Sequence, residues 1–403
     1  MKSSHCVVLV ASSLAGLGLP AVACSGDDSN SPGRDAGTDT NKPDSNRADS
    51  GPWPTAYHAE LNGYQETPQV VATTATGKAD LVLSADKKTL SYRVQHNVQN
   101  LTDAHIHVGA AMESGSIVYS ISPLGNTMEG TIPIVSADDV PNLDSAKWYI
   151  NLHSSTNHGG EIRGQILHPN EILYVASLNG GQEVPPSGSA ATGTAAVVLR
   201  ADTQELLYHV KTSLAPTMAH IHTGLAAKAG DVAIDFAATT GIIDGKKPIT
   251  AAQVTDLAEG RLYVNVHTTL KPAGEIRGQL VLPGEVLYSG SMTGAKEVPS
   301  TPSTATGIAQ FILAPDSKSI RYEAVFSGMV ATMAHIHFGA AGANGDVVNT
   351  LNLVNNGAGV KGTLFGADAG ATDLDKLNTG QYYINAHSAT YPNGEIRSQI
   401  QKP

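Results

Sequence analysis

The histidines of this chain are spaced in a way that suits metal chemistry. The 403-residue sequence contains 15 histidines, and nine of them fall in two patterns that each occur three times. The first pattern is Ala-His-Ile-His-x-Gly, and the second, further along, is Tyr-x-Asn-x-His-(Ser/Thr). Side chains alternate along a strand, so both imidazoles of His-x-His should share one face while the isoleucine faces the core. The nine residues are His105, His107, His153, His220, His222, His267, His335, His337 and His387.

Three imidazoles around a free coordination position suit a transition metal. The third histidine follows the pair after 46, 45 or 50 residues, on a different expected strand from which it can approach the pair. Neutral imidazole is a good ligand for zinc and copper, with zinc–nitrogen bonds of about 2.0 Å. The spacing therefore predicts one copper or zinc site in each copy of the pattern.

Other repeated polar residues accompany the histidines. The block Gly-Glu-Ile-Arg-(Gly/Ser)-Gln supplies glutamates that we expect to fix an imidazole tautomer or to act as a fourth ligand. Its arginines share a strand face with them and can form a local ion pair, and the asparagines of the second pattern should hold a turn or a neighbouring backbone. These residues are Glu161, Arg163, Glu275, Arg277, Glu395, Arg397, Asn151, Asn265 and Asn385. An earlier (Gln/Lys)-Glu-x-Pro block adds Glu66, Glu183 and Glu297 as further candidates.

The same residues also permit a purely structural interpretation. Histidines bonded to carbonyls or to the Gly-Glu-Ile-Arg carboxylate would pin two strands together without any metal. The glycines two residues after each His-x-His, namely Gly109, Gly224 and Gly339, are expected to be turn positions with positive φ. The sequence leaves the metal-binding and structural interpretations open.

The spacing of the repeats defines the domain organisation. The Ala-His-Ile-His pattern recurs with an offset of 115 residues both times, which predicts three tandem modules, each long enough for its own core. We place module 1 at 57–169, module 2 at 170–283 and module 3 at 284–403. Short alternating runs such as 78–83 and 89–95 predict seven or eight strands per module, in an all-β sandwich or Greek-key barrel. Helix is expected only near 136–144 and 250–259, capped by Ser136 and Thr250.

The N-terminal residues have the pattern of an export signal. An apolar run ends in Ala-Val-Ala-Cys at residues 21–24, which resembles the lipobox of bacterial lipoproteins. This resemblance implies a signal peptide over 1–23 and a lipid on Cys24, and the polar residues 24–56 predict a disordered tether. We therefore expect an exported protein, lipid-anchored at the outer membrane or cell surface or facing the periplasm. Cys6 lies in the signal, so the mature chain would form no intramolecular disulfide.

The charge of the chain excludes one class of partner. The formal net charge is −11 and no cluster of Lys and Arg occurs, whereas nucleic-acid binding needs a basic surface. Enzyme signatures are also weak, since the Gly-x-Ser-x-Gly pattern of hydrolases is absent. The His-x-His pair with a distant histidine resembles the copper half of copper–zinc superoxide dismutase. The remaining histidines do not recur between modules, so the chain favours a binding protein over an enzyme.

The three blocks in fixed order resemble the CHRD domain, the module first described in chordin. The resemblance covers about 57–401, three times over, and the departures at Thr67, Gln69, Ser300 and Ser398 leave the histidines untouched. It implies a secreted or surface all-β module, which in chordin belongs to a protein that binds growth factors. We therefore expect a surface protein whose modules bind a transition metal, or a protein or glycan partner. The alternatives are a dismutase-like copper redox enzyme and a purely structural surface or matrix protein.

Overall fold

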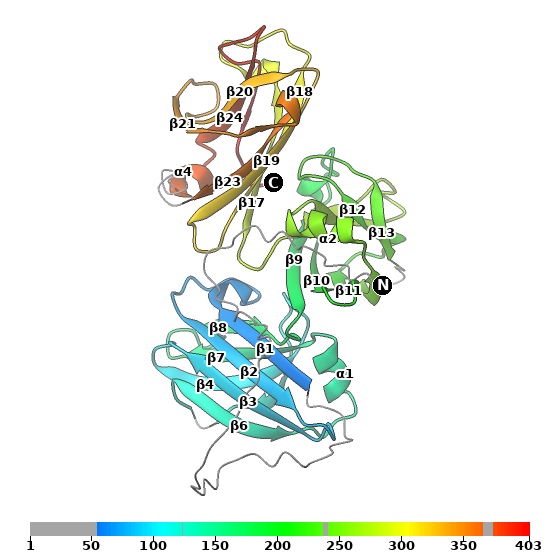
Figure 1. The fold of residues 1–403 in the computed structure, drawn as a ribbon. Coiled ribbons are helices and arrows are strands. Elements are labelled where there is room, and N and C mark those ends of the chain that lie inside the picture. The colour runs from blue at the N-terminus through cyan, green and yellow to red at the C-terminus, as the bar shows by residue number, and fades with distance from the viewer. Residues whose placement is uncertain (1–54, 123, 237–240, 366–373) are drawn as a thin grey trace, which may run out of the picture. The chain divides into compact units, whose positions relative to one another are not determined.

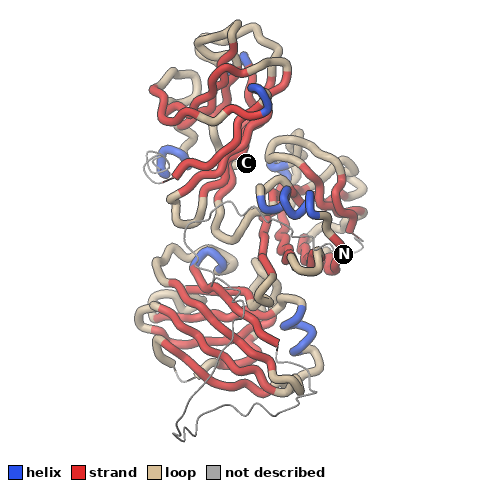
Figure 2. Tube along the Cα trace, in the orientation of Figure 1, coloured by secondary structure: helices blue, strands red, loops and turns tan. Residues whose placement is uncertain are grey.

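The computed structural model describes residues 55–403 except 123, 237–240 and 366–373 (Figure 1). The expected signal peptide, Cys24 and nearly all of the expected tether lie outside the described residues. The described chain is mostly β, with short helices between strands (Figure 2). No helix in this part of the chain is both long and apolar enough to cross a membrane.

Each module forms one antiparallel, barrel-like sheet with the same strand order. In module 1 the order is β5-β4-β7-β8-β1-β2-β3-β6. The strand β1 pairs along its length with β2 but meets β8 only at Asn62 and Arg163, so the two halves of the sheet join there. The strands are β1 (Thr55–Asn62), β2 (Thr76–Leu83), β3 (Thr89–His96), β4 (Leu101–Val108), β5 (Ile117–Ser120), β6 (Thr127–Pro133), β7 (Trp148–Ser154) and β8 (Ile162–Gln165).

Modules 2 and 3 repeat this order, and module 3 adds one short edge strand. Module 2 consists of β9 (Glu171–Asn179), β10 (Thr192–Arg200), β11 (Glu205–Thr212), β12 (Met218–Thr223), β13 (Val232–Phe236), β14 (Ile242–Pro248), β15 (Leu262–His267) and β16 (Ile276–Gln279). Module 3 consists of β17 (Val286–Thr293), β18 (Thr306–Leu313), β19 (Ser319–Ser327), β20 (Ala331–Phe338), β21 (Asp346–Thr350), β22 (Leu353–Val354), β23 (Gly359–Phe365), β24 (Tyr382–Ser388) and β25 (Ile396–Gln399).

Alternation of apolar and polar residues explains why these segments form strands. Along β2 every second residue is buried, and the same alternation continues in β3. The inward-facing side chains of each module form a separate apolar core, which in module 1 includes Leu81, Val94, Ile106 and Trp148. The all-β prediction is therefore confirmed, because a period of two buries one face of a strand and leaves the other face for polar residues.

The described residues form three short α-helices, α1 (Asp139–Asp144), α2 (Ala251–Ala258) and α4 (Leu374–Asn378). They also form four short 3-10 helices, η1 (Gly63–Gln65), η2 (Gly180–Gln182), η3 (Gly294–Lys296) and η4 (Asn355–Gly357). The prediction for Thr250 is confirmed, because its side chain caps α2 in a capping box with Gln253. The prediction for Ser136 is wrong, since Asp138 is the N-cap of α1. The backbone N–H of Ser136 instead donates to the carboxylate of Asp139, which ties the loop back to the helix.

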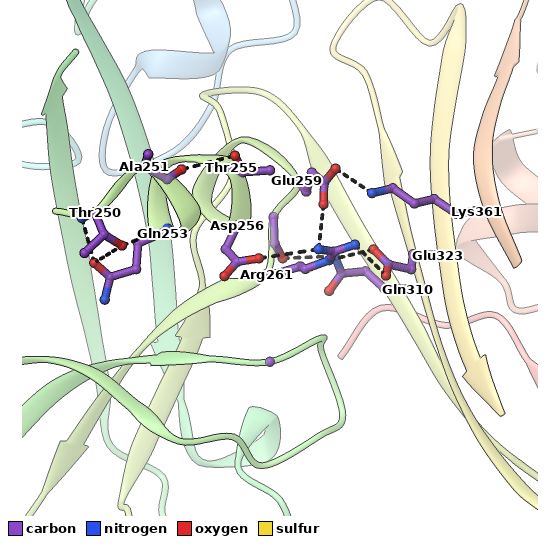
Figure 3. A network of polar contacts seen from close by, with 12 residues as sticks. Thr250, Ala251, Gln253, Thr255, Asp256, Glu259, Arg261, Gln310, Glu323 and Lys361 are labelled. Atoms are coloured by element: carbon purple, nitrogen blue, oxygen red, sulfur yellow. Dashed lines mark hydrogen bonds and ion pairs between the residues drawn. The ribbon is translucent and has the colours of Figure 1, made fainter. Parts of the chain in front are cut away.

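A polar network links modules 2 and 3 (Figure 3). Arg261, just after α2, donates to both carboxylate oxygens of Glu323 on β19, at 2.8 and 2.7 Å. Glu259 pairs with Arg261 and with Lys361 of β23. Gln310 of β18 donates to the carbonyl of Gly260 at 2.9 Å, next to the same ion pairs. These contacts use residues of β18, β19 and β23, whereas the histidines of module 3 belong to β20 and β24.

Candidate metal centre

The register of two neighbouring strands brings the histidines of module 1 together. In the β4–β7 pair, His105 lies opposite Asn151, His107 opposite Tyr149, and Asp103 opposite His153. All three imidazoles therefore belong to one face of the sheet, while Ile106 is fully buried on the other face. The predicted arrangement of His-x-His on one face is confirmed.

The three rings of each module lie at distances that suit a single ion. In each module the three potential ligand atoms lie within 4.8 Å of one another. The Nδ1 atom of His105 lies 3.3 Å from Nε2 of His153, and the equivalent distances in modules 2 and 3 are 3.1 and 3.0 Å. Tetrahedral zinc with its ordinary bond lengths places ligand nitrogens about 3.3 Å apart. One of the three nitrogen–nitrogen distances in each cluster thus already matches that of a zinc site.

Backbone carbonyls decide which nitrogen of two of these histidines carries the proton. The Nδ1 of His107 lies 2.9 Å from the Gly115 carbonyl, and the Nδ1 of His153 lies 3.0 Å from the His158 carbonyl. A carbonyl only accepts, so each Nδ1 must donate a proton, and Nε2 keeps a lone pair. The same bonds recur from His222 to Gly230, His267 to Pro272, His337 to Gly345, and His387 to Pro392.

Burial favours the neutral form of seven of the nine cluster histidines. Burial lowers the pKa of His107 below its ordinary 6.5, and the nearby imidazoles of His105 and His153 lower it further, although the bond to Gly115 opposes the shift. Burial is also the largest cause of the lowered pKa of His105. Lowered values recur at His222, His267, His335, His337 and His387, again mainly through burial. Neutral imidazole is the form that binds a metal.

One nitrogen in each cluster is buried without a partner. Among the described residues, the Nε2 atoms of His107, His222 and His337 have no hydrogen-bond partner although water cannot reach them. Buried polar atoms are nearly always satisfied in folded proteins. The Nε2 lone pair of the second histidine is thus unpartnered in every module, and this histidine belongs to the three-histidine group described above.

A tyrosine and an arginine support the second histidine of the pair. The ring of His107 stacks on Tyr149 with centroids 4.9 Å apart, and the Arg163 guanidinium lies 3.4 Å from the centroid of the same tyrosine. Arg163 is buried and donates to the carbonyls of Ala110 and Glu113. It thereby holds the loop whose Gly115 carbonyl sets the tautomer of His107. The stack recurs with Tyr263 and Arg277, and with Tyr383 and Arg397.

These tyrosines begin the second repeated block, but the sequence pattern alone indicates no role for them. The expectation of a positive φ at Gly109, Gly224 and Gly339 is wrong. A Cβ on Gly109 would lie only 3.2 Å from the Tyr149 ring, so close packing explains the glycine. The equivalent distances at Gly224 and Gly339 are 3.4 and 3.1 Å.

The glutamates of the Gly-Glu-Ile-Arg block bind hydroxyl groups. Glu161 accepts from Thr73, Glu275 from Ser189 and Thr268, and Glu395 from Ser303. The expected pair between Glu161 and Arg163 does not form, since that arginine is occupied with carbonyls. Backbone carbonyls, and not these glutamates, therefore fix the tautomers of the histidines. Each glutamate instead contacts the loop that precedes β2 or its equivalent, through Thr73, Ser189 or Ser303.

The earlier glutamate block forms a buried pair with the asparagines. Asn151 donates to Glu66, Asn265 to Glu183, and Asn385 to Glu297. Burial raises the pKa of each of these three glutamates to about 7, which the nearby arginine and asparagine only partly oppose. The asparagines thus hold a carboxyl group where the sequence suggested a turn or backbone partner. This layer lies beside the histidines on the same sheet face, because Asn151 is the cross-strand partner of His105.

Comparison with known proteins agrees with this repeated geometry. The chain matches the CHRD domain family over residues 57–166, 174–280 and 288–400. It is also similar to chordin of Danio rerio, with 27% identity over 163 residues. That alignment covers 36% of this chain and 17% of chordin. Since the three family matches cover most of the sequence, the chain belongs to the CHRD domain family.

Proposed function

We propose that this protein binds transition-metal ions, one in each module, through the nine histidines of the three clusters. The buried, unpartnered Nε2 of the second histidine in each pair carries this proposal. A metal ion bound among the three rings would satisfy that lone pair and would replace the contact between Nδ1 of the first histidine and Nε2 of the third.

The donor set indicates which ions fit. Three neutral imidazoles are borderline ligands that suit zinc and copper better than magnesium or calcium, which prefer oxygen. Three protein ligands leave a coordination position that water or an outside ligand can fill. We therefore propose zinc or copper as the bound ion.

The structural interpretation explains only part of the geometry. The carbonyl bonds of His107 and His153 would hold two strands together without a metal. They use only the Nδ1 atoms, however, and leave the Nε2 atoms directed into the cluster. A purely structural role gives no reason to bury the same unpartnered nitrogen in all three modules.

The expected lipid on Cys24 would place these sites outside the cytoplasm. We propose that the modules act at the outer membrane or cell surface, where they meet exogenous metal. The residues around Cys24 in the sequence support this placement. Cells fed radiolabelled palmitate should label the full chain but not a Cys24→Ala variant, and labelling of both would contradict the proposal.

Elemental analysis of the full chain, purified without a histidine tag, tests the metal sites. After incubation with zinc or copper and removal of excess ion, we expect close to one equivalent per module. A variant with His107→Gln, His222→Gln and His337→Gln should retain almost none while keeping its circular dichroism spectrum. The matched control carries His58→Gln and His96→Gln, outside the clusters, and should bind like the parent. Failure of the parent to bind either ion would overturn the proposal.

A further inference from the structure

The three clusters share their histidines but differ in what faces the first histidine from the neighbouring strand. We infer that Asp235 makes the site of module 2 tighter than that of module 3, by holding His220 through its outer nitrogen. This inference rests on the proposed function, because it ranks the sites that the proposal assigns.

The register of the β12–β13 pair sets this contact. His220 and Asp235 are direct cross-strand partners, and the Nε2 of His220 lies 3.2 Å from a carboxylate oxygen of Asp235. The other ring nitrogen, Nδ1, lies 3.1 Å from Nε2 of His267 inside the cluster. One imidazole therefore connects the carboxylate to the group of ligand atoms.

A carboxylate at this position does two things for a ligand. It accepts the Nε2 proton, which fixes the tautomer with a lone pair on Nδ1, and it makes that lone pair more basic. In module 2 carbonyls of Gly230 and Pro272 hold His222 and His267 in the tautomers that a metal needs. Asp235 favours the same kind of tautomer in His220, against the Nδ1–H form that would donate to His267.

The other modules have uncharged residues at the same position. Ser120 is the cross-strand partner of His105, and Thr350 is the partner of His335. A hydroxyl group can accept a hydrogen bond but brings no negative charge to the imidazole. Module 3 is the cleaner comparison, because module 1 has Asp103 on β4, whose charge also acts on His105.

The exposure of Asp235 limits the size of the effect. Its side chain is 72% exposed, so water screens much of its charge. Loss of an outer partner of a metal-bound histidine costs about 10- to 100-fold in affinity, and the exposure favours the lower end. We expect zinc to bind module 2 about tenfold more tightly than module 3.

Full-length chains with one working cluster each can measure this difference. Glutamine at two of the three positions His107, His222 and His337 leaves a single site, and competition with a chromophoric chelator gives its zinc affinity. Asp235→Thr should lower the affinity of module 2 about tenfold, and Thr350→Asp should raise that of module 3 by a similar factor. Asp235→Asn and Thr350→Asn are the matched controls, because they keep the size without the charge. Both positions are exposed, so the variants should fold.

The outcomes separate the two proposals. The role of Asp235 is supported if both modules bind zinc tightly with aspartate at this position and more weakly with threonine or asparagine. Equal affinities of modules 2 and 3 that neither substitution alters would overturn this inference while metal binding stands. Failure of every single-site chain to bind zinc would overturn the proposed function instead. Cobalt provides a second readout, since its visible spectrum should shift with Asp235→Thr in the module 2 chain.

Discussion

The two halves of each sheet differ in how closely their outer residues are repeated from one module to the next. On the outer face of β4, β7 and β8, the histidines, the stacked tyrosine and the buried arginine make the same contacts in all three modules. On the outer face of β2 and β3 the backbone register is also the same, but Asp80, Ala196 and Gln310 occupy one equivalent position. The same strands can therefore be built with quite different outer residues.

This difference separates what the fold requires from what another role requires. Strand register depends on the alternating inner face, which both halves share. Outer residues of β2, β3 and their equivalents vary with their local surroundings. Glu323 on β19, the equivalent of β3, pairs with Arg261 of module 2, for example. The fold alone does not explain why the histidines, the tyrosine and the arginine make the same contacts in all three modules, whereas a bound ligand would explain it.

The largest expected effect tests whether the histidine face is also needed for stability. Arg277 is 2% exposed and donates to the carbonyls of Leu225 and Lys228. Arg277→Met should cost module 2 about 3–5 kcal/mol, because it leaves these buried groups and Glu183 without their cationic partner. Differential scanning calorimetry should show one transition moved to a lower temperature. An unchanged scan would mean that the arginine layer does not stabilise the module.

A second prediction uses pH. Burial raises the pKa of Glu183 from 4.5 to about 7, so its stabilising contribution is complete below pH 4.5 and is lost as the pH rises through 7. Glu183→Gln stays neutral and keeps a similar shape. In metal-free protein, the parent should lose on the order of 3 kcal/mol relative to this variant between pH 4 and 8. Denaturant unfolding at several pH values measures this difference, and parallel curves would refute the assigned burial.

A third prediction compares the two faces of a single strand. Ile221→Val on the inner face of β12 should lower the stability of module 2 by about 1 kcal/mol and leave zinc binding unchanged. His222→Gln, one residue further, should abolish zinc binding in module 2 with little loss of stability, because it removes an unpartnered buried nitrogen. Thermal unfolding and a zinc titration of both variants separate the two roles. Loss of folding in His222→Gln would favour the structural interpretation.

The smallest effect is expected on the outer face of β3. Arg93 pairs with Glu129 at 3.2 Å, but the side chains are 54% and 61% exposed. Arg93→Ser should change the free energy of unfolding by less than about 0.5 kcal/mol, since exposed ion pairs contribute little. Chemical denaturation measures this change, and a cost above 1 kcal/mol would mean that this face supports the fold more than its variability suggests.

The sequence predicted the composition of the site better than its internal chemistry. Period-two alternation places His105 and His107 on one face and Ile106 on the other, and the repeats identify the third histidine. The tautomers depend on carbonyls such as that of Gly115, which lie in loops whose path no periodicity reveals. The contact of Asp235 with His220 was equally hidden, because the β12–β13 register contains an irregularity between Ile221 and His222. The role of Tyr149 depends on a stack that only the folded sheet brings together.

The carbonyl bonds to His107 and His153 also have a consequence for how an ion would enter. Each Nδ1 proton is already committed to a carbonyl, so each Nε2 presents its lone pair and an arriving ion displaces no proton from that nitrogen. The heat of binding measured by calorimetry should then be nearly the same in buffers of different ionisation enthalpy. Association should also be fast, because neither ring has to turn before it coordinates.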